Sequence, residues 1–246
     1  MTDSFGRNIN YLRVSLTDRC NLRCRYCMPE KGIDKKSHRD ILSLEDIYEI
    51  IRTAVEMGFS KVRLTGGEPL VRKGVIELCR SISGLSGVKD FAMTTNGLLL
   101  PKKLDILRDA PALHKLSISL HSYESNRPDV PLETYLRGCF DACDVMGQRG
   151  TVCTLRLWNK GAEPQLNGEI ERILGELAGV DTRLLPRDSV GNRRLMYRTY
   201  IEEAQRFHWP GDPEYTGPDA EYCYGLRKQI AVLCDGTVVG KHKVSC

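Results

Sequence analysis

The sequence lacks any apolar run long enough to cross a bilayer, any repeat at a fixed period and any low-complexity tract. Residues 1–10 contain no apolar segment of the kind found in secretory leaders, so we expect a cytoplasmic protein with no membrane partner. The net charge is only +4, and we therefore expect no nucleic-acid partner. What remains is a globular protein whose 246 residues suffice to bury one proper core.

Cysteine, by contrast, is plentiful, with 10 residues in the chain. Without a recognisable export signal, these thiols are expected to stay reduced, because disulfides persist mainly in oxidising compartments. Metal binding or catalysis therefore explains them better than a disulfide framework.

Three of the cysteines form a short cluster, Cys20, Cys24 and Cys27, in a loop that follows an expected strand at residues 11–16. Spacings of three and two intervening residues allow a loop to wrap one small inorganic cluster. A [4Fe–4S] cluster normally takes four cysteines, and this loop supplies three. The spacing thus predicts a [4Fe–4S] cluster with one iron left for a small molecule.

Two other interpretations of these cysteines stay open. A zinc site needs four ligands, and Cys223, Cys234 or His38 would have to supply the fourth from a distance. Alternatively, the three thiols are simply buried and bind nothing, because free cysteine is among the most buried residue types.

The chain downstream predicts alternating strands and helices. Ser43 is the expected N-cap of a helix that ends at Gly58. The remaining expected strands are 61–65, 89–95, 113–120, 151–158 and a weakly marked one at 180–185, and the expected helices include segments around 75–82, 101–109, 132–148 and 168–177. Such strand–helix units favour a parallel sheet with right-handed crossovers.

The strands alternate apolar and polar residues, as in Leu12-Arg13-Val14-Ser15 and Val62-Arg63-Leu64-Thr65. If the apolar faces meet the helices, the polar faces line one interior, which favours an open, partial (β/α)6 barrel of the TIM type. An antiparallel sheet with one wet face would alternate in the same way, but it would not need the intervening helices.

A second motif, Gly66-Gly67-Glu68-Pro69, follows the strand at 61–65. Together with the Cys-x3-Cys-x2-Cys spacing it resembles the radical SAM superfamily. The resemblance implies an enzyme in which Cys20, Cys24 and Cys27 hold the catalytic cluster and S-adenosylmethionine chelates the open iron. It also implies cofactor contacts by Tyr26, by Gly66, Gly67 and Glu68, and by Ser119 on the fourth strand.

The first hundred residues further resemble the GTP 3′,8-cyclases of molybdenum cofactor biosynthesis. The similar stretches include 12–19, 27–30, 63–70 and 94–98. This resemblance implies that Arg13, Arg63 and Thr94 contact GTP, although the two arginines would also be explained by pairing with Glu68 or with the cofactor's carboxylate. The family's Ser-Leu-Asp on the fourth strand is Ser119-Leu120-His121 here.

The second half of the chain resembles radical SAM proteins with a SPASM-type tail, notably at Cys223-Tyr224-Gly225 and Cys234-Asp235-Gly236. That pattern places a cysteine at position 241, where this chain has lysine. We therefore divide the chain into an N-terminal segment (1–10), a core barrel (11–200) and a truncated SPASM-like extension (201–246) that is short and irregular. A shifted or truncated reading frame over 240–246 is one explanation of this ending.

The resemblance implies reductive cleavage of S-adenosylmethionine to a 5′-deoxyadenosyl radical, which takes hydrogen from a small-molecule or peptide substrate. A flavodoxin- or ferredoxin-like one-electron donor is the implied partner. Either a GTP cyclase-like reaction or a SPASM-type reaction on a peptide fits the motifs. An inactive protein that binds a cluster or zinc is the alternative from another class.

Overall fold

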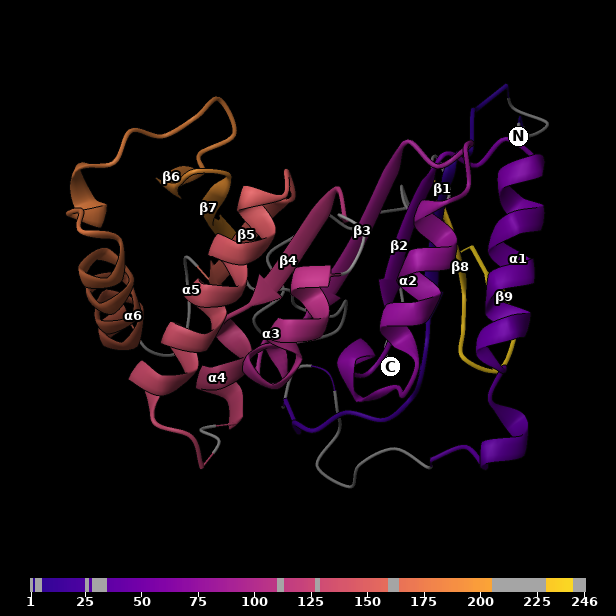
Figure 1. Cartoon of the computed structure of the whole chain (residues 1–246), viewed down its shortest axis with the longest axis horizontal. Helices are drawn as coiled ribbons and strands as arrows, with labels where there is room; N and C mark the ends of the chain where they lie inside the picture. Colours follow the sequence, from indigo (N-terminus) through magenta and orange to yellow (C-terminus); the bar gives the residue numbers. More distant parts are fainter. Residues whose placement is uncertain are drawn as a thin grey trace, which may run out of the picture.

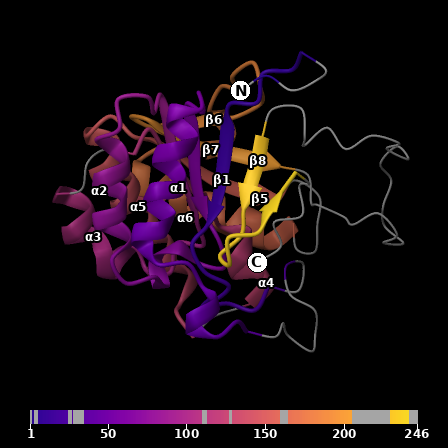
Figure 2. The same cartoon turned by 90° about the vertical axis from the view of Figure 1, so that its right-hand side faces the viewer.

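A parallel sheet with helices on one side forms the body of the molecule, as Figures 1 and 2 show. The computed structural model describes residues 2, 6–24, 27, 35–109, 113–126, 129–158, 164–204 and 229–240. Among them, no helix is both long and apolar enough to cross a membrane. The expected cysteine positions 223 and 246 lie outside these ranges.

The strands are β1 (Tyr11–Ser15), β2 (Lys61–Thr65), β3 (Asp90–Thr95), β4 (Lys115–Ser119), β5 (Val152–Trp158), β6 (Arg193–Met196), β7 (Thr199–Ala204), β8 (Gln229–Val232) and β9 (Val238–Val239). The helices are α1 (Leu44–Glu56), α2 (Val75–Ser83), α3 (Leu100–Asp109), α4 (His121–Asn126), α5 (Leu132–Gln148) and α6 (Pro164–Ala178). Short 3₁₀ helices cover His38–Asp40, Pro69–Val71 and Thr182–Leu184.

These strands form one sheet in the order β6-β7-β5-β4-β3-β2-β1-β8-β9. The pairings from β8 through β1, β2, β3, β4 and β5 to β7 are parallel, while β6 and β9 pair antiparallel at the two edges. The mixed α/β fold with a mostly parallel sheet, expected from the alternating pattern, is therefore confirmed, and it is consistent with a partial radical SAM barrel.

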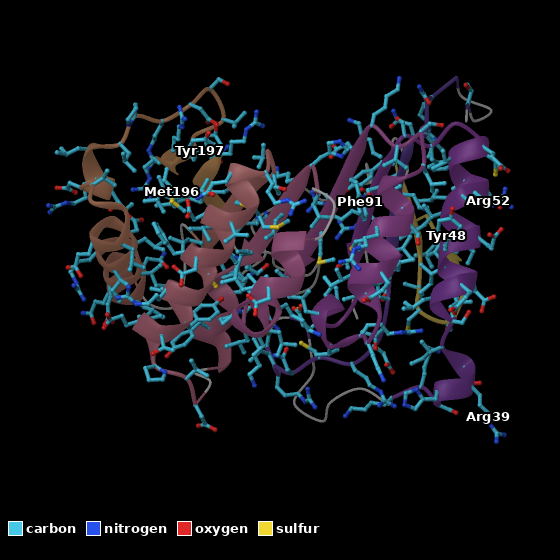
Figure 3. All side chains as sticks on the ribbon, viewed as in Figure 1. Arg39, Tyr48, Arg52, Phe91, Met196 and Tyr197 are labelled. Atoms are coloured by element: carbon cyan, nitrogen blue, oxygen red, sulfur yellow. The ribbon has the colours of Figure 1, made fainter. Side chains whose placement is uncertain are left out.

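The apolar sides of the strands face the helices. Leu12, Val14, Leu64, Ile118 and Leu155 are each at most 1% exposed and belong to one continuous core. Figure 3 marks the two layers: Phe91 lies on the central strand β3, whereas Arg52 lies on the outer side of α1. Because apolar burial drives folding, this layer fixes the polar sides of the same strands on the opposite face.

Helix α1 begins as its sequence predicts. The Ser43 Oγ accepts a hydrogen bond from the Asp46 N–H at 3.0 Å, and the Asp46 carboxylate accepts one from the Ser43 N–H at 3.2 Å. This reciprocal capping box satisfies two N–H groups at the helix start. The chain leaves the helix at Gly58, whose φ of 95° is a left-handed conformation that glycine adopts without strain.

The sixth parallel strand is not where the sequence suggested. The segment at 180–185 contains the 3₁₀ helix Thr182–Leu184, and the strand that pairs with β5 is β7, reached through the short antiparallel strand β6. The turn between β6 and β7 is at Tyr197, labelled beside Met196 in Figure 3, with a φ of 34°. The apolar residues at 180–185 were too few to distinguish a strand from a single helical turn.

A hairpin near the C-terminal end of the chain extends the sheet beside β1. β8 pairs with β1 in parallel register, and β9 returns antiparallel after a turn at Asp235 and Gly236, as expected from that dipeptide. The hairpin also reaches the segment after the cysteine loop: the Leu42 N–H donates to the Cys234 carbonyl at 2.8 Å, and Lys36 pairs with Asp235 at 2.8 Å. The sequence did not predict this docking.

Candidate functional site

The segments that follow β1, β2, β3 and β4 meet at one edge of the sheet. Because these strands are parallel and adjacent, their carboxyl ends lie side by side, which is where α/β folds commonly bind ligands. The cysteine loop follows β1, Gly66 and Gly67 follow β2, Asn96 follows β3, and His121 begins α4 directly after β4.

A cavity of about 210 Å³ lies between these segments. Its lining comprises Cys20, Leu22, Cys24, Cys27, Thr65, Gly66, Gly67, Glu68, Thr94, Thr95, Asn96, Ser119, His121, Ser122 and Arg156. Most residues expected to contact a cofactor are thus brought together by three different strand ends. Arg13 and Arg63 are not part of this lining, and Tyr26 lies outside the described residues.

The three cysteines differ in their exposure. Cys24 is buried, Cys20 is partly buried and Cys27 is exposed. A turn joins the last two, since the Cys27 N–H donates to the Cys24 carbonyl at 2.9 Å, and the Cys20 Sγ accepts from the Leu22 N–H at 3.4 Å. Burial raises the pKa of the Cys20 thiol, against the lowering effect of that N–H.

Gly66 and Gly67 pack against the backbone of the cysteine loop. A Cβ on Gly67 would lie 2.2 Å from the Arg19 carbonyl oxygen, and one on Gly66 would lie 2.8 Å from that of Thr17. The Gly67 N–H donates to the Thr17 carbonyl at 2.7 Å, and Gly66 has a φ of 138°. Only glycine permits this approach, so the sequence motif is explained here by the contact between two loops.

Glu68 is buried, and its carboxylate accepts hydrogen bonds from two backbone N–H groups and one hydroxyl. One oxygen accepts from the Thr95 hydroxyl at 2.6 Å and the Leu70 N–H at 3.0 Å, and the other accepts from the Asn96 N–H at 2.7 Å. Burial raises the pKa of this carboxyl, while these hydrogen bonds oppose the shift. Among the described residues no arginine pairs with Glu68, so the ion pair with Arg63 considered from the sequence is absent.

Asn96 was not predicted as a site residue. Its side-chain Nδ2 donates to the Asn21 Oδ1 at 2.8 Å and to the Cys20 Sγ at 3.8 Å, so it touches a member of the cysteine cluster directly. The signals in the sequence were its position straight after a strand, in front of Gly97, and its place in the stretch 94–98 that resembles the cyclases.

The polar sides of the central strands form a second part of the site. Arg13 and Arg63 are register partners on β1 and β2. The Arg63 guanidinium donates to the Thr94 Oγ1 at 2.9 Å and to the Ser117 Oγ at 3.4 Å. No described carboxylate lies within 4.0 Å of Arg63, which leaves a partly buried positive charge on this face.

His121 lines the cavity and its ring stacks on Trp158, a pair that sequence reasoning missed. Their rings stack with centroids 4.5 Å apart and an angle of 13°. The His121 Nδ1 lies 3.3 Å from the Arg156 carbonyl, and Arg156 pairs with Glu202 at 3.1 Å. Burial, followed by the positive charge of Arg156, lowers the pKa of His121 to about 4, so this ring is neutral at pH 7.

Three cysteines that line one cavity offer thiolates of the kind that bind an iron–sulfur cluster. Among the described residues, no group of three or more His, Cys, Asp or Glu side chains is close enough to share one metal ion, and Cys234 and His38 do not join the three cysteines. In a [4Fe–4S] cluster each cysteine binds its own iron, so the sulfurs need not converge on one point. Three thiols on one cavity therefore suit a cluster.

Comparison with known families agrees with this geometry. The family described as the Radical SAM superfamily matches residues 14–155, which is more than half of the chain. The matched region begins in β1 and ends in β5, and it contains the three cysteines, the two glycines and Ser119.

Curated relatives match about half of the chain. "GTP 3′,8-cyclase" of Alkaliphilus metalliredigens is 58% identical over 129 residues, which cover 52% of this chain and 39% of that protein. The protein of the same name from Peptoclostridium acidaminophilum is 52% identical over 150 residues, covering 59% of this chain and 46% of its own length. The matched part thus spans less than half the length of these relatives.

Solved structures match the fold more widely. SuiB of Streptococcus suis, crystallised with its precursor peptide SuiA, superposes with a TM-score of 0.59 at 16% identity and covers 95% of this chain and 60% of that one. SuiB bound to S-adenosylmethionine gives a TM-score of 0.58 at 14% identity, covering 96% of this chain and 61% of its own. At such identity the likeness establishes the fold alone.

Proposed function

Because this chain belongs to the radical SAM superfamily, we propose that it is an enzyme whose Cys20, Cys24 and Cys27 bind a [4Fe–4S] cluster and whose adjoining cavity takes S-adenosylmethionine. The observation that carries the proposal is that the three cysteines, Gly67 and Ser119 line one cavity although they come from three separate strand ends. The family implies both cofactors.

The chain's own residues would then divide the work. The three thiolates would hold the cluster, the backbone after β2 would bind the amino acid moiety of S-adenosylmethionine, and Ser119 would supply a hydroxyl at the end of β4. Glu68 fastens this backbone to β3 through Thr95 and Asn96. When bound, the two cofactors would supply the one-electron cleavage of S-adenosylmethionine to methionine and a 5′-deoxyadenosyl radical that takes hydrogen from the substrate.

For the substrate, we propose GTP and a cyclisation of the kind that the names of the relatives state. Arg13 and Arg63 support it, because two neighbouring guanidinium groups on the polar face suit a triphosphate. Thr94 bridges this face and the cavity: it accepts from Arg63 and lines the space beside the cysteines.

The test is anaerobic reconstitution of the protein, followed by iron and sulfide analysis and by incubation with S-adenosylmethionine, dithionite and GTP. We expect about four irons per chain, and we expect this iron to be lost when Cys20, Cys24 or Cys27 is substituted. We also expect 5′-deoxyadenosine as a product and a cyclised pterin precursor from GTP. Stoichiometric zinc without colour would favour the zinc-binding alternative. A cluster that yields no 5′-deoxyadenosine would favour the inactive one.

A peptide substrate is the second candidate. His121 favours it. The cyclase family that this chain resembles has an aspartate at this position, whereas this chain has a neutral imidazole stacked on Trp158. SuiB is crystallised with a precursor peptide, and this chain shares its fold. Formation of 5′-deoxyadenosine without any GTP-derived product, together with stimulation by a candidate peptide, would select this candidate over the cyclase.

We also propose a flavodoxin- or ferredoxin-like donor that docks over the cysteine loop. Cys27 is exposed there, and the exposed side chains of the flanking sequence include Arg19, Arg23 and Lys35. This positive surface suits an acidic redox protein, whose association falls as salt rises. A rate of 5′-deoxyadenosine formation with flavodoxin that does not respond to ionic strength would contradict this docking.

The barrel over 11–200, with 201–246 as its extension, remains our proposed division of the chain.

A further inference from the structure

Asn96 occupies the turn after β3 and is fixed there from three directions. Its N–H donates to the Glu68 carboxylate at 2.7 Å, and its carbonyl accepts from the Tyr135 hydroxyl at 2.7 Å. Its side-chain Oδ1 accepts from the Leu98 N–H at 3.1 Å. Because an amide carries its oxygen and nitrogen on opposite branches, the Leu98 contact turns the Nδ2 in the other direction.

That other direction leads to the cysteine loop. The Nδ2 donates to the Asn21 Oδ1 at 2.8 Å and to the Cys20 Sγ at 3.8 Å, which is within hydrogen-bonding range for sulfur. Asn96 is 7% exposed, so water contributes little to keeping this donor in place. The donor is thus oriented toward Cys20 by protein contacts alone.

A hydrogen bond to a ligating sulfur has a defined consequence for an iron–sulfur cluster. Reduction adds negative charge to the cluster, and part of that charge resides on the thiolate sulfurs. An N–H aimed at such a sulfur stabilises the reduced form more than the oxidised form and raises the reduction potential. Neutral side chains that act in this way tune a cluster without being its ligands.

We propose that Asn96 is a positioning residue for the cluster: through its hydrogen bond to Cys20 it orients this ligand and makes the cluster easier to reduce. The inference rests on the proposed role of Cys20 as a ligand. Asn21 acts in the opposite sense, because its Oδ1 holds the same NH₂ group at the shorter distance and so keeps it from a closer approach to Cys20.

The experiment compares the midpoint potentials of anaerobically reconstituted wild-type and Asn96→Ala proteins. Each protein is titrated with a reductant, and the signal of the reduced cluster is followed by electron paramagnetic resonance. We expect a several-fold lower ratio of reduced to oxidised cluster at a fixed potential in Asn96→Ala. A tenfold change would correspond to about 59 mV for this one-electron couple. An unchanged or higher potential in a variant that holds the wild-type amount of iron would overturn the inference.

Two matched variants separate the electronic effect from a structural one. Tyr135→Phe removes the hydroxyl on the other side of Asn96 and leaves the donor to Cys20 in place, so its potential should equal that of the wild type. Asn21→Ala removes, at an exposed position, the acceptor that holds the Asn96 NH₂ group away from Cys20, and we expect a higher potential. If Asn96→Ala fails to hold iron, an Asn21→Ala potential at or below that of the wild type still overturns the inference.

The outcome also distinguishes this inference from the proposed function. If the wild-type protein assembles no cluster that depends on Cys20, the proposed function itself fails. If the cluster assembles and cleaves S-adenosylmethionine but its potential ignores both asparagine substitutions, only the role of Asn96 is wrong.

Discussion

The N–H of Glu68 donates a 2.9 Å hydrogen bond to the carbonyl of Arg19, the residue that precedes the first cysteine of the cluster loop. One residue earlier on the same strand end, Gly67 bonds to Thr17. The two motifs that the sequence suggested as separate signals are therefore one piece of structure, in which the backbone after β2 supports the loop after β1. A substitution in one motif should therefore displace the backbone of the other.

Gly67→Ala should abolish cluster assembly. The added Cβ would lie 2.2 Å from the Arg19 carbonyl oxygen, and a backbone atom cannot turn aside as the end of a flexible side chain can. The cysteine loop must therefore move, and we expect less than about a tenth of the wild-type iron after reconstitution, because misplaced ligands lose orders of magnitude in affinity. Iron and sulfide analysis measures this.

Gly168→Ala is the matched control for that substitution. Gly168 lies in the exposed part of α6, and nothing lies within 4 Å of where its Cβ would be. Alanine there should leave iron content unchanged and should stabilise the protein by roughly 0.5–1 kcal/mol, because it lowers the entropy of the unfolded chain. Equal iron in Gly67→Ala and wild-type proteins would show that the loop does not need this contact.

Glu68→Gln should lower the free energy of unfolding by roughly 1–3 kcal/mol, because a buried hydrogen-bonding group would lose its partner. The carboxylate accepts bonds at both oxygens, whereas the glutamine amide would bring an N–H₂ group against either the Asn96 N–H or the donors from Leu70 and Thr95. Urea denaturation of the cluster-free protein measures the change. The exposed substitution Glu45→Gln, in the first turn of α1, is the control and should cost little.

Much of the fold followed from the sequence because its signals are local. The alternation along β1 and β2 predicted which side chains meet the helices, and Ser43 predicted the start of α1. The hairpin from β8 to β9 was placed in the chain by Asp235 and Gly236, but its pairing with β1 was not predicted. Strand pairing across more than two hundred residues leaves no local pattern in a single sequence.

The site divides in the same way. Motif spacing predicted the cysteines and Gly67 as site residues, because that prediction depends on residue type and on close neighbours in the chain. Asn96 and His121 act through partners 76 and 35 residues away, Cys20 and Arg156, so their contacts become visible only when the strand ends are brought together. Gly67 also makes a contact that the sequence did not suggest, since a Cβ there would meet the Arg19 carbonyl of the cysteine loop.

His121 should make the stability of the protein depend on pH between about 4 and 6.5. Burial lowers its pKa to about 4 in the folded state, while the unfolded chain keeps the ordinary value near 6.5. Between these values the unfolded state binds more protons than the folded state. The contribution of His121 to the free energy of unfolding is therefore full above about pH 6.5 and falls as the pH decreases toward 4. A shift of this size corresponds to on the order of 3 kcal/mol at most.

The measurement is urea denaturation of cluster-free protein at several pH values, comparing wild type with His121→Phe. Phenylalanine keeps a ring against Trp158 and cannot be protonated. The free energy of unfolding of the wild type should therefore fall relative to that of His121→Phe as the pH falls. His38→Phe, at an exposed position, is the control and should keep the wild-type dependence. Parallel curves for His121→Phe and wild type would contradict a buried neutral histidine.

Arg63→Met should weaken the binding of a triphosphate about 10- to 100-fold, since charge-assisted hydrogen bonds contribute roughly 1.5–3 kcal/mol. The two described acceptors of Arg63 are the neutral hydroxyls of Thr94 and Ser117, and no described carboxylate balances its charge. Methionine keeps much of the aliphatic length and removes the charge. Arg52→Met is the control, because Arg52 pairs with Glu49 and Glu56 on the exposed side of α1. Calorimetric titration of the reconstituted proteins with GTP should separate the two variants. If both variants bind GTP as the wild type does, Arg63 does not contact the triphosphate.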